Sequence, residues 1–236
     1  MSGLDDLKFS AEQFSGIAPL FPLPNLVLFP HVVQALHVFE SRYREMIEEV
    51  LKGDRLLCLG LLSRGWQQDY EGRPPVESTV CLGRLISHHR REDGTYNVLM
   101  VGLSRARIVE ELAPSRSYRQ VRLRLMDDQS LSDDEEISQR CERLQRDLME
   151  RFQQHLPASK ASFQQLENLL GNHISLGMLT DLVGYSLDAS VWTKQTLLCE
   201  LDACRRAELL LNYLRRQTGD GETAESNDFP PRFSIN

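Results

Sequence analysis

The spacing of apolar residues changes once along the chain, at Asp127, and this change limits the fold more than any other feature. Before Asp127 the apolar residues come in short runs, and Val121, Leu123 and Leu125 alternate with arginines. Such alternation is typical of a half-buried strand, because successive side chains of a strand point to opposite faces. After Asp127 they recur at helical spacing, at Ile137, Cys141, Leu144, Leu148 and Phe152. The pattern predicts an α+β protein in which a β domain precedes a helical one.

The first half contains a series of short candidate strands. We expect strands at residues 25–29, 32–38, 55–62, 80–87, 96–101, 105–112 and 121–125. Pro24 and Pro30 bracket the first of these, because proline cannot donate to a ladder. Asp93-Gly94 predicts a tight hairpin turn. Residues 40–52 instead place their apolar side chains on one helix face. Short strands with one inserted helix predict a small, closed or nearly closed β-barrel.

The second half reads as a bundle of four or five helices. A capping box at Ser132-x-x-Glu135 starts the first, which runs to about Pro157. Further helices are expected at residues 163–170, 176–187, 191–199 and 202–216. The predicted organisation is therefore a flexible N-terminus at 1–16, a β-barrel at 17–127, a helical bundle at 128–217 and a disordered tail at 218–236.

Composition narrows the classes of function and the compartment. The formal net charge is −7, and the excess of acidic over basic residues lies in the second half. This argues against non-specific binding of nucleic acid, which depends on phosphate neutralisation. The chain shows no secretory leader and no apolar run of membrane-spanning length. Five scattered cysteines without a Cys-x-x-Cys pair indicate reduced thiols. We expect a cytoplasmic protein.

The opening of the chain carries a longer motif. It reads Pro19-Leu-Phe-Pro-Leu23, then Val27-Leu-Phe-Pro30, then Leu36-His-Val-Phe-Glu-Ser-Arg-Tyr43. These residues resemble the N-terminal domain of the Lon proteases. Weaker similarity continues at residues 93–94 and 101–105 and at Lys194-Gln195 with Arg206. The resemblance covers roughly residues 17–216 and implies a PUA-like β-barrel followed by helices, the substrate-binding domain of that family.

The sequence also departs from full-length Lon proteases. His31 stands where the family usually has glycine, so the turn after Pro30 is expected to differ, and Ala207 stands where leucine is common. The chain contains no G-x-x-x-x-G-K-[ST] loop for a triphosphate and no Ser–Lys pair in a protease context. We therefore expect a stand-alone, non-enzymatic domain without cofactors.

Several charged residues invite a functional interpretation, and a structural one is favoured for each. Glu40 is expected in the first turn of a helix, where a carboxylate is stabilised, with Arg105 as its ion-pair partner. We interpret Phe39, Glu40, Arg42, Tyr43 and Arg105 together as a structural motif. His88 and His89 cannot face one metal ion, because neighbouring strand residues point to opposite faces, so no metal site is expected. Arg119, Arg122 and Arg124 form a basic strand edge that is the solvated side of a strand, or alternatively an RNA track.

The main hypothesis is a module that binds unfolded or exposed apolar segments of polypeptide. Such a surface needs accessible apolar side chains, and the best candidates are Phe29, Pro30 and His31 in one loop and Trp66 and Tyr70 in another. A role as an adaptor in protein quality control, docked on a separate protease or chaperone, uses the same kind of surface. The alternative is a PUA-like RNA-binding protein. The oligomeric state and the client stay open.

Overall fold

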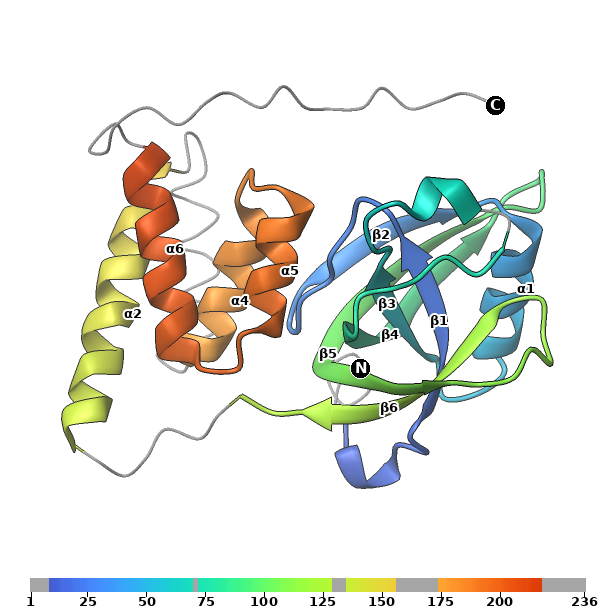
Figure 1. Cartoon of the computed structure of the whole chain (residues 1–236), viewed down its shortest axis with the longest axis horizontal. Helices are drawn as coiled ribbons and strands as arrows, with labels where there is room; N and C mark the ends of the chain where they lie inside the picture. The colour runs from blue at the N-terminus through green and yellow to red at the C-terminus, as the bar shows by residue number, and fades with distance from the viewer. Residues whose placement is uncertain (1–8, 70–71, 129–134, 156–173, 218–236) are drawn as a thin grey trace.

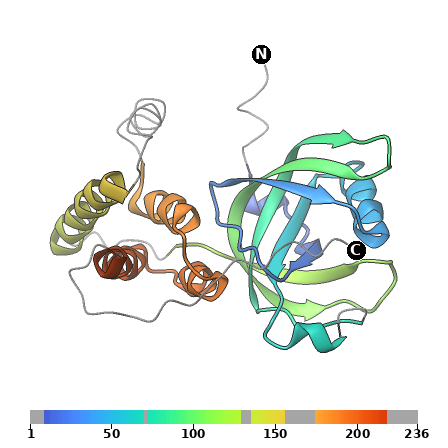
Figure 2. The same ribbon diagram turned by 90° about the horizontal axis from the view of Figure 1, so that it is seen from above.

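The computed structural model describes residues 9–69, 72–128, 135–155 and 174–217. A curled β-sheet holds the first part of the chain, and a group of helices lies beside it (Figure 1). Seen from above, the helices that follow the last strand lie on one side of the sheet, whereas the helix inserted between the second and third strands lies at the far side of the barrel, as Figure 2 shows. The expected order, strands first and helices second, is confirmed within these residues.

The six strands form one sheet. They are β1 (Ile17–Leu23), β2 (Val33–Val38), β3 (Leu56–Leu61), β4 (Thr79–Arg90), β5 (Tyr96–Glu111) and β6 (Arg119–Met126). The strand order is β2-β5-β4-β3-β1-β6, and an additional pairing between β5 and β6 closes the last five of these strands into a ring. β2 lies outside the ring, paired with β5 alone among the described strands. The prediction of a small, nearly closed barrel is confirmed.

Two apolar clusters stabilise the molecule. The smaller cluster takes residues from each of the five ring strands, including Leu20, Cys58, Leu82, Ala106 and Val121, and fills the ring. Phe9 and Phe14, which flank the short 3-10 helix η2 (Ala11–Gln13), pack against it, where we expected a loose terminus. The larger cluster joins the other face of the sheet to all the described α-helices. The outer face of the sheet and the helices therefore share one core, which is separate from the core inside the ring.

The predicted strand at residues 25–29 is wrong, and β1 lies before it. β1 contains Pro19 and Pro22, yet each proline has a strand partner on one side only. Pro19 pairs with Gln120 of β6, and Pro22 pairs with Gly60 of β3. A missing N–H therefore faces the open side, where no ladder bond is lost. The apolar residues Val27, Leu28 and Phe29 are buried in an irregular segment instead.

β5 is one long strand rather than the two that we predicted. It runs through Gly102, where the register against β4 shifts at a β-bulge. A Cβ atom at Gly102 would lie 2.0 Å from the carbonyl oxygen of Phe29. His31 N donates to Gly102 O, and Gly102 N donates to Val32 O, both at 2.9 Å. Glycine is thus required where the 24–32 loop crosses the strand.

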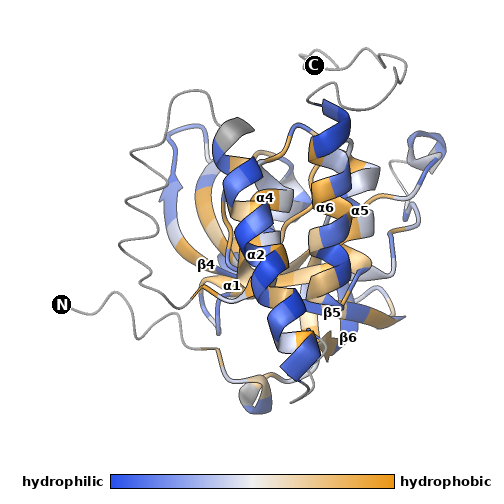
Figure 3. Cartoon of the chain, turned by 90° about the vertical axis from the view of Figure 1, so that its left-hand side faces the viewer, coloured by the Kyte–Doolittle hydropathy of each residue, from blue (hydrophilic) through white to orange (hydrophobic). Residues whose placement is uncertain are grey.

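The helices follow the predicted spacing. They are α1 (Ser41–Val50), α2 (Glu135–His155), α4 (Leu176–Ser186), α5 (Val191–Cys199) and α6 (Ala203–Gln217). Ser175 and Ser190 cap α4 and α5, each accepting a hydrogen bond from a backbone N–H of the first turn. α2 turns a largely hydrophilic surface outward (Figure 3). Ser132, the helix predicted at 163–170 and the predicted tail lie outside the described residues.

The cysteine prediction is wrong for one pair. Cys141 on α2 and Cys204 on α6 form a disulfide, with their Cα atoms 5.9 Å apart. The two residues are 63 positions apart in sequence, so no local spacing indicated that the packing of α2 against α6 would bring them together. Cys58, Cys81 and Cys199 are free thiols, and burial raises the pKa of the first two well above the ordinary value.

Candidate functional site

A buried group of charges joins the barrel to the helices. Arg105 of β5 donates from Nε to Leu198 O at 3.0 Å and from both terminal nitrogens to the carboxylate of Asp181 on α4. Arg105 is 3% exposed and Asp181 1%. Arg206 of α6 lies against the same carboxylate, with Nε 3.8 Å from Asp181 Oδ1. Arg206 also binds Asp128, two residues after the end of β6, at 2.6 Å.

The expected pairing of Arg105 with Glu40 is wrong. Arg105 binds Asp181 of α4 and Leu198 O of α5 instead, two contacts between distant parts of the chain that the sequence pattern could not show. Burial raises the pKa of Asp181, and the guanidinium of Arg105 opposes that shift. All three guanidinium nitrogens of Arg105 have protein acceptors. We call Arg105, Asp181 and Arg206 the buried lock, because they tie the barrel to the helices. No guanidinium nitrogen of Arg105 is left to bind a ligand, so its role is structural.

The Lys194-Gln195 and Arg206 motif belongs to the same contact. Gln195, which is buried, donates from Nε2 to Thr79 O of β4 at 2.8 Å. Lys194 donates to Tyr185 O at 2.7 Å and so holds α5 to the end of α4. These residues fasten helices to each other and to the barrel.

Of the five residues predicted to bind a partner, the four that the structure describes do not form one surface. Phe29 is fully buried, with its ring beside Gly184 of α4, and Pro30 is buried too. In this conformation neither side chain is available to a ligand. His31 is exposed and has a φ of 66°, the left-handed region that glycine adopts without cost, which explains the family's preference at this turn.

The second predicted loop lies near the helices. Trp66 opens the 3-10 helix η3 (Trp66–Asp69) and is half-buried, and Tyr70 lies outside the described residues. The neighbouring Arg64 places its guanidinium 4.8 Å from the ring centre of Trp192 on α5. The loop is thus tied to the helical part, and a binding role for Trp66 stays a prediction.

The motif around residue 40 organises the start of α1. Glu40 is the residue before the helix, and its carboxylate binds Arg42 at 2.8 Å. Arg42 also covers the ring of Tyr43, which is buried against Phe21 with ring centres 4.6 Å apart. Phe39 is different: its side chain is 62% exposed. It therefore belongs to a surface and not to the core.

An apolar surface that the sequence analysis did not single out lies on a three-stranded extension of the barrel. We call this extension the wing: β2, residues 96–101 of β5 and residues 85–90 of β4. Ala35 pairs with Leu99, which pairs with Ser87, and His37 pairs with Asn97, which pairs with His89. The outward side of the wing, which we call the wing face, carries Val33, Ala35, His37, Ser87, His89, Asn97 and Leu99.

The wing face is open and mostly uncharged. Val33 is 51% exposed and Leu99 39%. A shallow depression of about 490 Å³ lies over Ala35, Ser87 and Leu99 and the neighbouring histidines. At its polar end, His37 Nδ1 lies 2.8 Å from Asn97 Oδ1, and the ring of Phe39 stacks near His37, with ring centres 6.1 Å apart. Exposed valine, leucine and phenylalanine gathered in one place mark an interaction surface more than scattered single residues do.

The sequence held a weak signal for this surface. β2 carries apolar residues on both of its faces, with Val33 and Ala35 on one and Leu36 and Val38 on the other. A strand at the edge of a barrel needs only one apolar face. The second apolar face could have identified the wing face, but only if β2 was known to lie at an edge.

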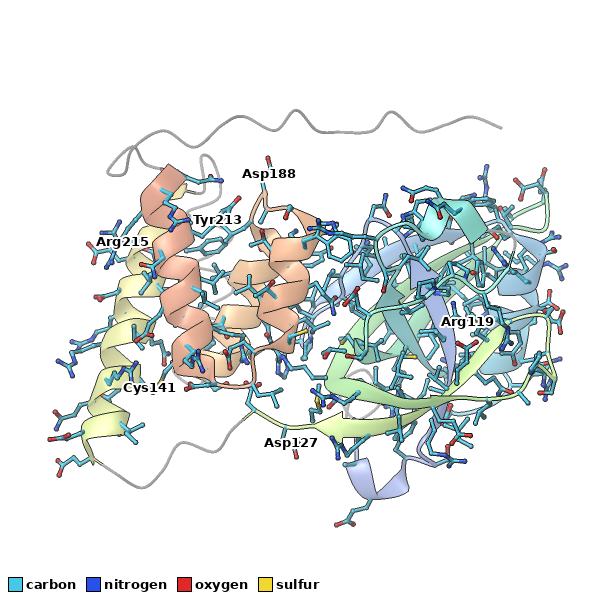
Figure 4. The ribbon with its side chains drawn as sticks, in the orientation of Figure 1. Arg119, Asp127, Cys141, Asp188, Tyr213 and Arg215 are labelled. Carbon is cyan, nitrogen blue, oxygen red and sulfur yellow. A yellow bond between two sulfur atoms is a disulfide. The ribbon has the colours of Figure 1, made fainter. Side chains whose placement is uncertain are left out.

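The basic strand is largely neutralised within the chain. Arg119, labelled in Figure 4, binds Glu111 at 2.6 Å and donates to Pro74 O. Arg122 lies 3.4 Å from Glu110, and Arg124 has no ion pair within the described residues. The same residues contain no group of three or more potential metal ligands among His, Cys, Asp and Glu. None of their helices combines the length and hydropathy needed to traverse a lipid bilayer.

Comparison with known proteins gives a consistent result. A family model described as the ATP-dependent protease La (LON) substrate-binding domain matches residues 17–216. A Lon protease of Heliobacterium modesticaldum is 29% identical over 199 residues, covering 84% of this chain and 24% of that protein. Lon protease 2 of Myxococcus xanthus is 25% identical over 209 residues, covering 87% of this chain and 24% of that protein. The chain therefore spans about a quarter of the length of the curated relatives it matches.

Solved structures show the same fold. The N-terminal domain of the Lon protease of the Mycobacterium avium complex matches with a TM-score of 0.64 and 16% identity, covering 84% of this chain and 97% of that one. A Lon N-terminal domain protein from Xanthomonas campestris matches with a TM-score of 0.57 and 20% identity, covering 84% and 98%. The expected combination of a barrel with following helices is thus confirmed as the fold of these domains.

Proposed function

The chain belongs to the LON substrate-binding domain family, and we propose that it is a non-enzymatic module that binds exposed apolar segments of polypeptide through the wing face. The observation that carries the proposal is the set of exposed apolar side chains, Val33 and Ala35 on β2 and Leu99 on the adjacent β5, with Phe39 beside them. An unfolded polypeptide offers apolar side chains of the same kind, and their contact removes apolar surface from water.

A direct binding measurement tests the proposal. The probe is reduced, carboxymethylated lysozyme, which stays unfolded in the absence of denaturant, and the readout is its dissociation constant from the intact protein. The variant Val33→Ser/Leu99→Ser removes two apolar contacts. Each is worth about 1 kcal/mol or more, so affinity should fall roughly ten-fold or more.

Val109→Ser is the matched control. Val109 is 59% exposed on the C-terminal half of β5, away from the wing. If binding depended on exposed apolar surface in general and not on a specific site, the control variant would also lose affinity. Equal binding by the wild type, the double variant and the control would reject the wing face as the binding surface.

The alternative of an RNA-binding protein finds less support in the geometry. Two of the three arginines of the basic strand are paired with glutamates, and the net charge is −7. A finer role, as an adaptor that presents bound polypeptide to a separate protease or chaperone, is compatible with the same surface. Co-purification of an ATPase with the protein from native cells, lost in Val33→Ser/Leu99→Ser, would support that role.

A further inference from the structure

The outer edge of β2 carries backbone groups that no described strand uses. The Val32–Gly102 pair is hydrogen-bonded, because Gly102 N donates to Val32 O. Hydrogen-bonded pairs alternate with non-hydrogen-bonded pairs in an antiparallel ladder. Gln34 and Leu36 therefore direct their N–H and C=O groups to β5. Val33, Ala35 and His37 direct theirs away from it, to the outer edge.

A side chain occupies one of these edge groups. Gln34 Nε2 donates to Ala35 O at 2.6 Å, which agrees with an outward direction for that carbonyl. Gln34 Oε1 in turn accepts a hydrogen bond from the hydroxyl of Tyr185 on α4, at 2.7 Å. The amide of Gln34 thus takes the place of a backbone donor from a neighbouring strand. A side chain that covers an edge carbonyl blunts the edge against uncontrolled pairing.

We propose that the outer edge of β2 receives the client polypeptide as an added strand, with Gln34 as the group that it displaces. This inference rests on the proposed function and adds the conformation in which the client binds. The groups presented by Val33, Ala35 and His37 are donors and acceptors spaced two residues apart, and an extended backbone matches that spacing. Every second side chain of the added strand then lies beside Val33 and Ala35. The preferred client is therefore an extended segment with apolar residues at alternate positions.

Two variants of the intact protein change the edge in opposite directions. Ala35→Pro removes an N–H that points away from β5 and puts a ring in its place, so it leaves the internal ladder intact and blocks the added strand. Its affinity for carboxymethylated lysozyme should fall about ten-fold or more. Gln34→Ala uncovers Ala35 O, and affinity should rise about 2- to 10-fold. Ala35→Val keeps the N–H and serves as the control.

Hydrogen exchange measured on the wild type gives a second readout that does not depend on the folding of a variant. The probe is the peptide acetyl-Lys-Val-Thr-Val-Thr-Val-Lys-amide. Without it the amides of Val33, Ala35 and His37 should exchange fast, and those of Gln34 and Leu36 slowly. With the peptide bound, the three edge amides should become protected while the rest of β2 changes little.

The outcomes separate this inference from the proposed function. Loss of binding in Ala35→Pro, gain in Gln34→Ala and protection of the three edge amides would support it. A second outcome is that carboxymethylated lysozyme binds through Val33 and Leu99, while Ala35→Pro binds it normally and the three edge amides stay unprotected. Binding as an added strand is then wrong, and the proposed function stands. If no polypeptide binds, both are wrong. Protection of the edge without peptide, together with a dimer in light scattering, would assign the edge to a second copy of the chain.

Discussion

Replacing Arg105 by methionine should strongly lower the free energy of unfolding, because it removes a main contact between the barrel and the helices. The variant keeps the length of the side chain but leaves the carboxylate of Asp181, 1% exposed, with Arg206 as its nearest cation at 3.8 Å. Removing one partner of a buried ion pair costs about 3–5 kcal/mol, because the remaining charge is desolvated without compensation. That is a large part of the about 5–15 kcal/mol by which domains are stable.

The stability loss should depend on pH in a defined direction. Burial already raises the pKa of Asp181, and the guanidinium of Arg105 opposes the shift. Without Arg105 the pKa of the folded state rises further above that of the unfolded chain, about 3.9. The folded variant then binds a proton that the unfolded chain does not, so lowering the pH stabilises the variant relative to the wild type. The difference in the free energy of unfolding between wild type and variant should therefore shrink as the pH is lowered from neutrality.

Urea unfolding followed by circular dichroism measures both effects. Arg107→Met is the control, because Arg107 is exposed on the same strand and has no ion pair within the described residues; its cost should stay within about 0.5 kcal/mol. A second comparison uses Arg105→Met/Asp181→Leu, which removes both charges and should recover part of the loss. A destabilisation of Arg105→Met below about 1 kcal/mol, or one that does not change with pH, would refute the role of the buried pair.

Two further substitutions test other contacts of the fold. Cys141→Ser opens a disulfide that closes a loop of 63 residues, and chain entropy predicts a loss of about 4 kcal/mol in the free energy of unfolding. The control Cys199→Ser, at an exposed free thiol, should change the free energy of unfolding little. A wild type whose stability is unaffected by a reducing agent would contradict the disulfide. Gly102→Ala places a Cβ atom 2.0 Å from Phe29 O and should cost about 2 kcal/mol or more. Gly53→Ala, where the nearest atom lies at 3.9 Å, should be tolerated in thermal unfolding, and equal effects of the two glycine variants would contradict the close approach.

Local periodicity was enough to locate most of the elements. Residues 121–124 of β6 alternate between buried and exposed side chains, and α5 begins and ends where the sequence predicted. The pattern gave wrong strand positions where a buried apolar segment makes no ladder hydrogen bonds, and where a strand contains prolines. Residues 27–29 are apolar because they fill the space between barrel and helices, and their backbone joins no ladder. Pro19 and Pro22 occupy a strand because each has an open side there.

Long-range pairing was the other part that the sequence could not supply. Arg105 and Asp181 are 76 residues apart, and Cys141 and Cys204 are 63 apart. Both pairs depend on which helix packs on which element, and periodicity along one segment carries no such information. For the same reason the wing face was missed: its members come from three strands, and none of them forms a motif alone. Exposure, and not residue type, distinguishes Leu99 from the buried leucines of the core.

The buried lock and the wing face are connected through the 24–32 loop. Phe29 is fixed between Gly102 of β5 and Gly184 of α4, and β2 begins four residues later at Val33. The helices also reach β2 directly, because Tyr185 holds the Gln34 amide that covers Ala35 O. Weakening the contact between Arg105 and Asp181 would therefore affect both contacts that position β2: the 24–32 loop and the hydrogen bond from Tyr185 to Gln34. The helical part thus does more than enlarge the core: it sets the position of the edge strand and the availability of its backbone groups.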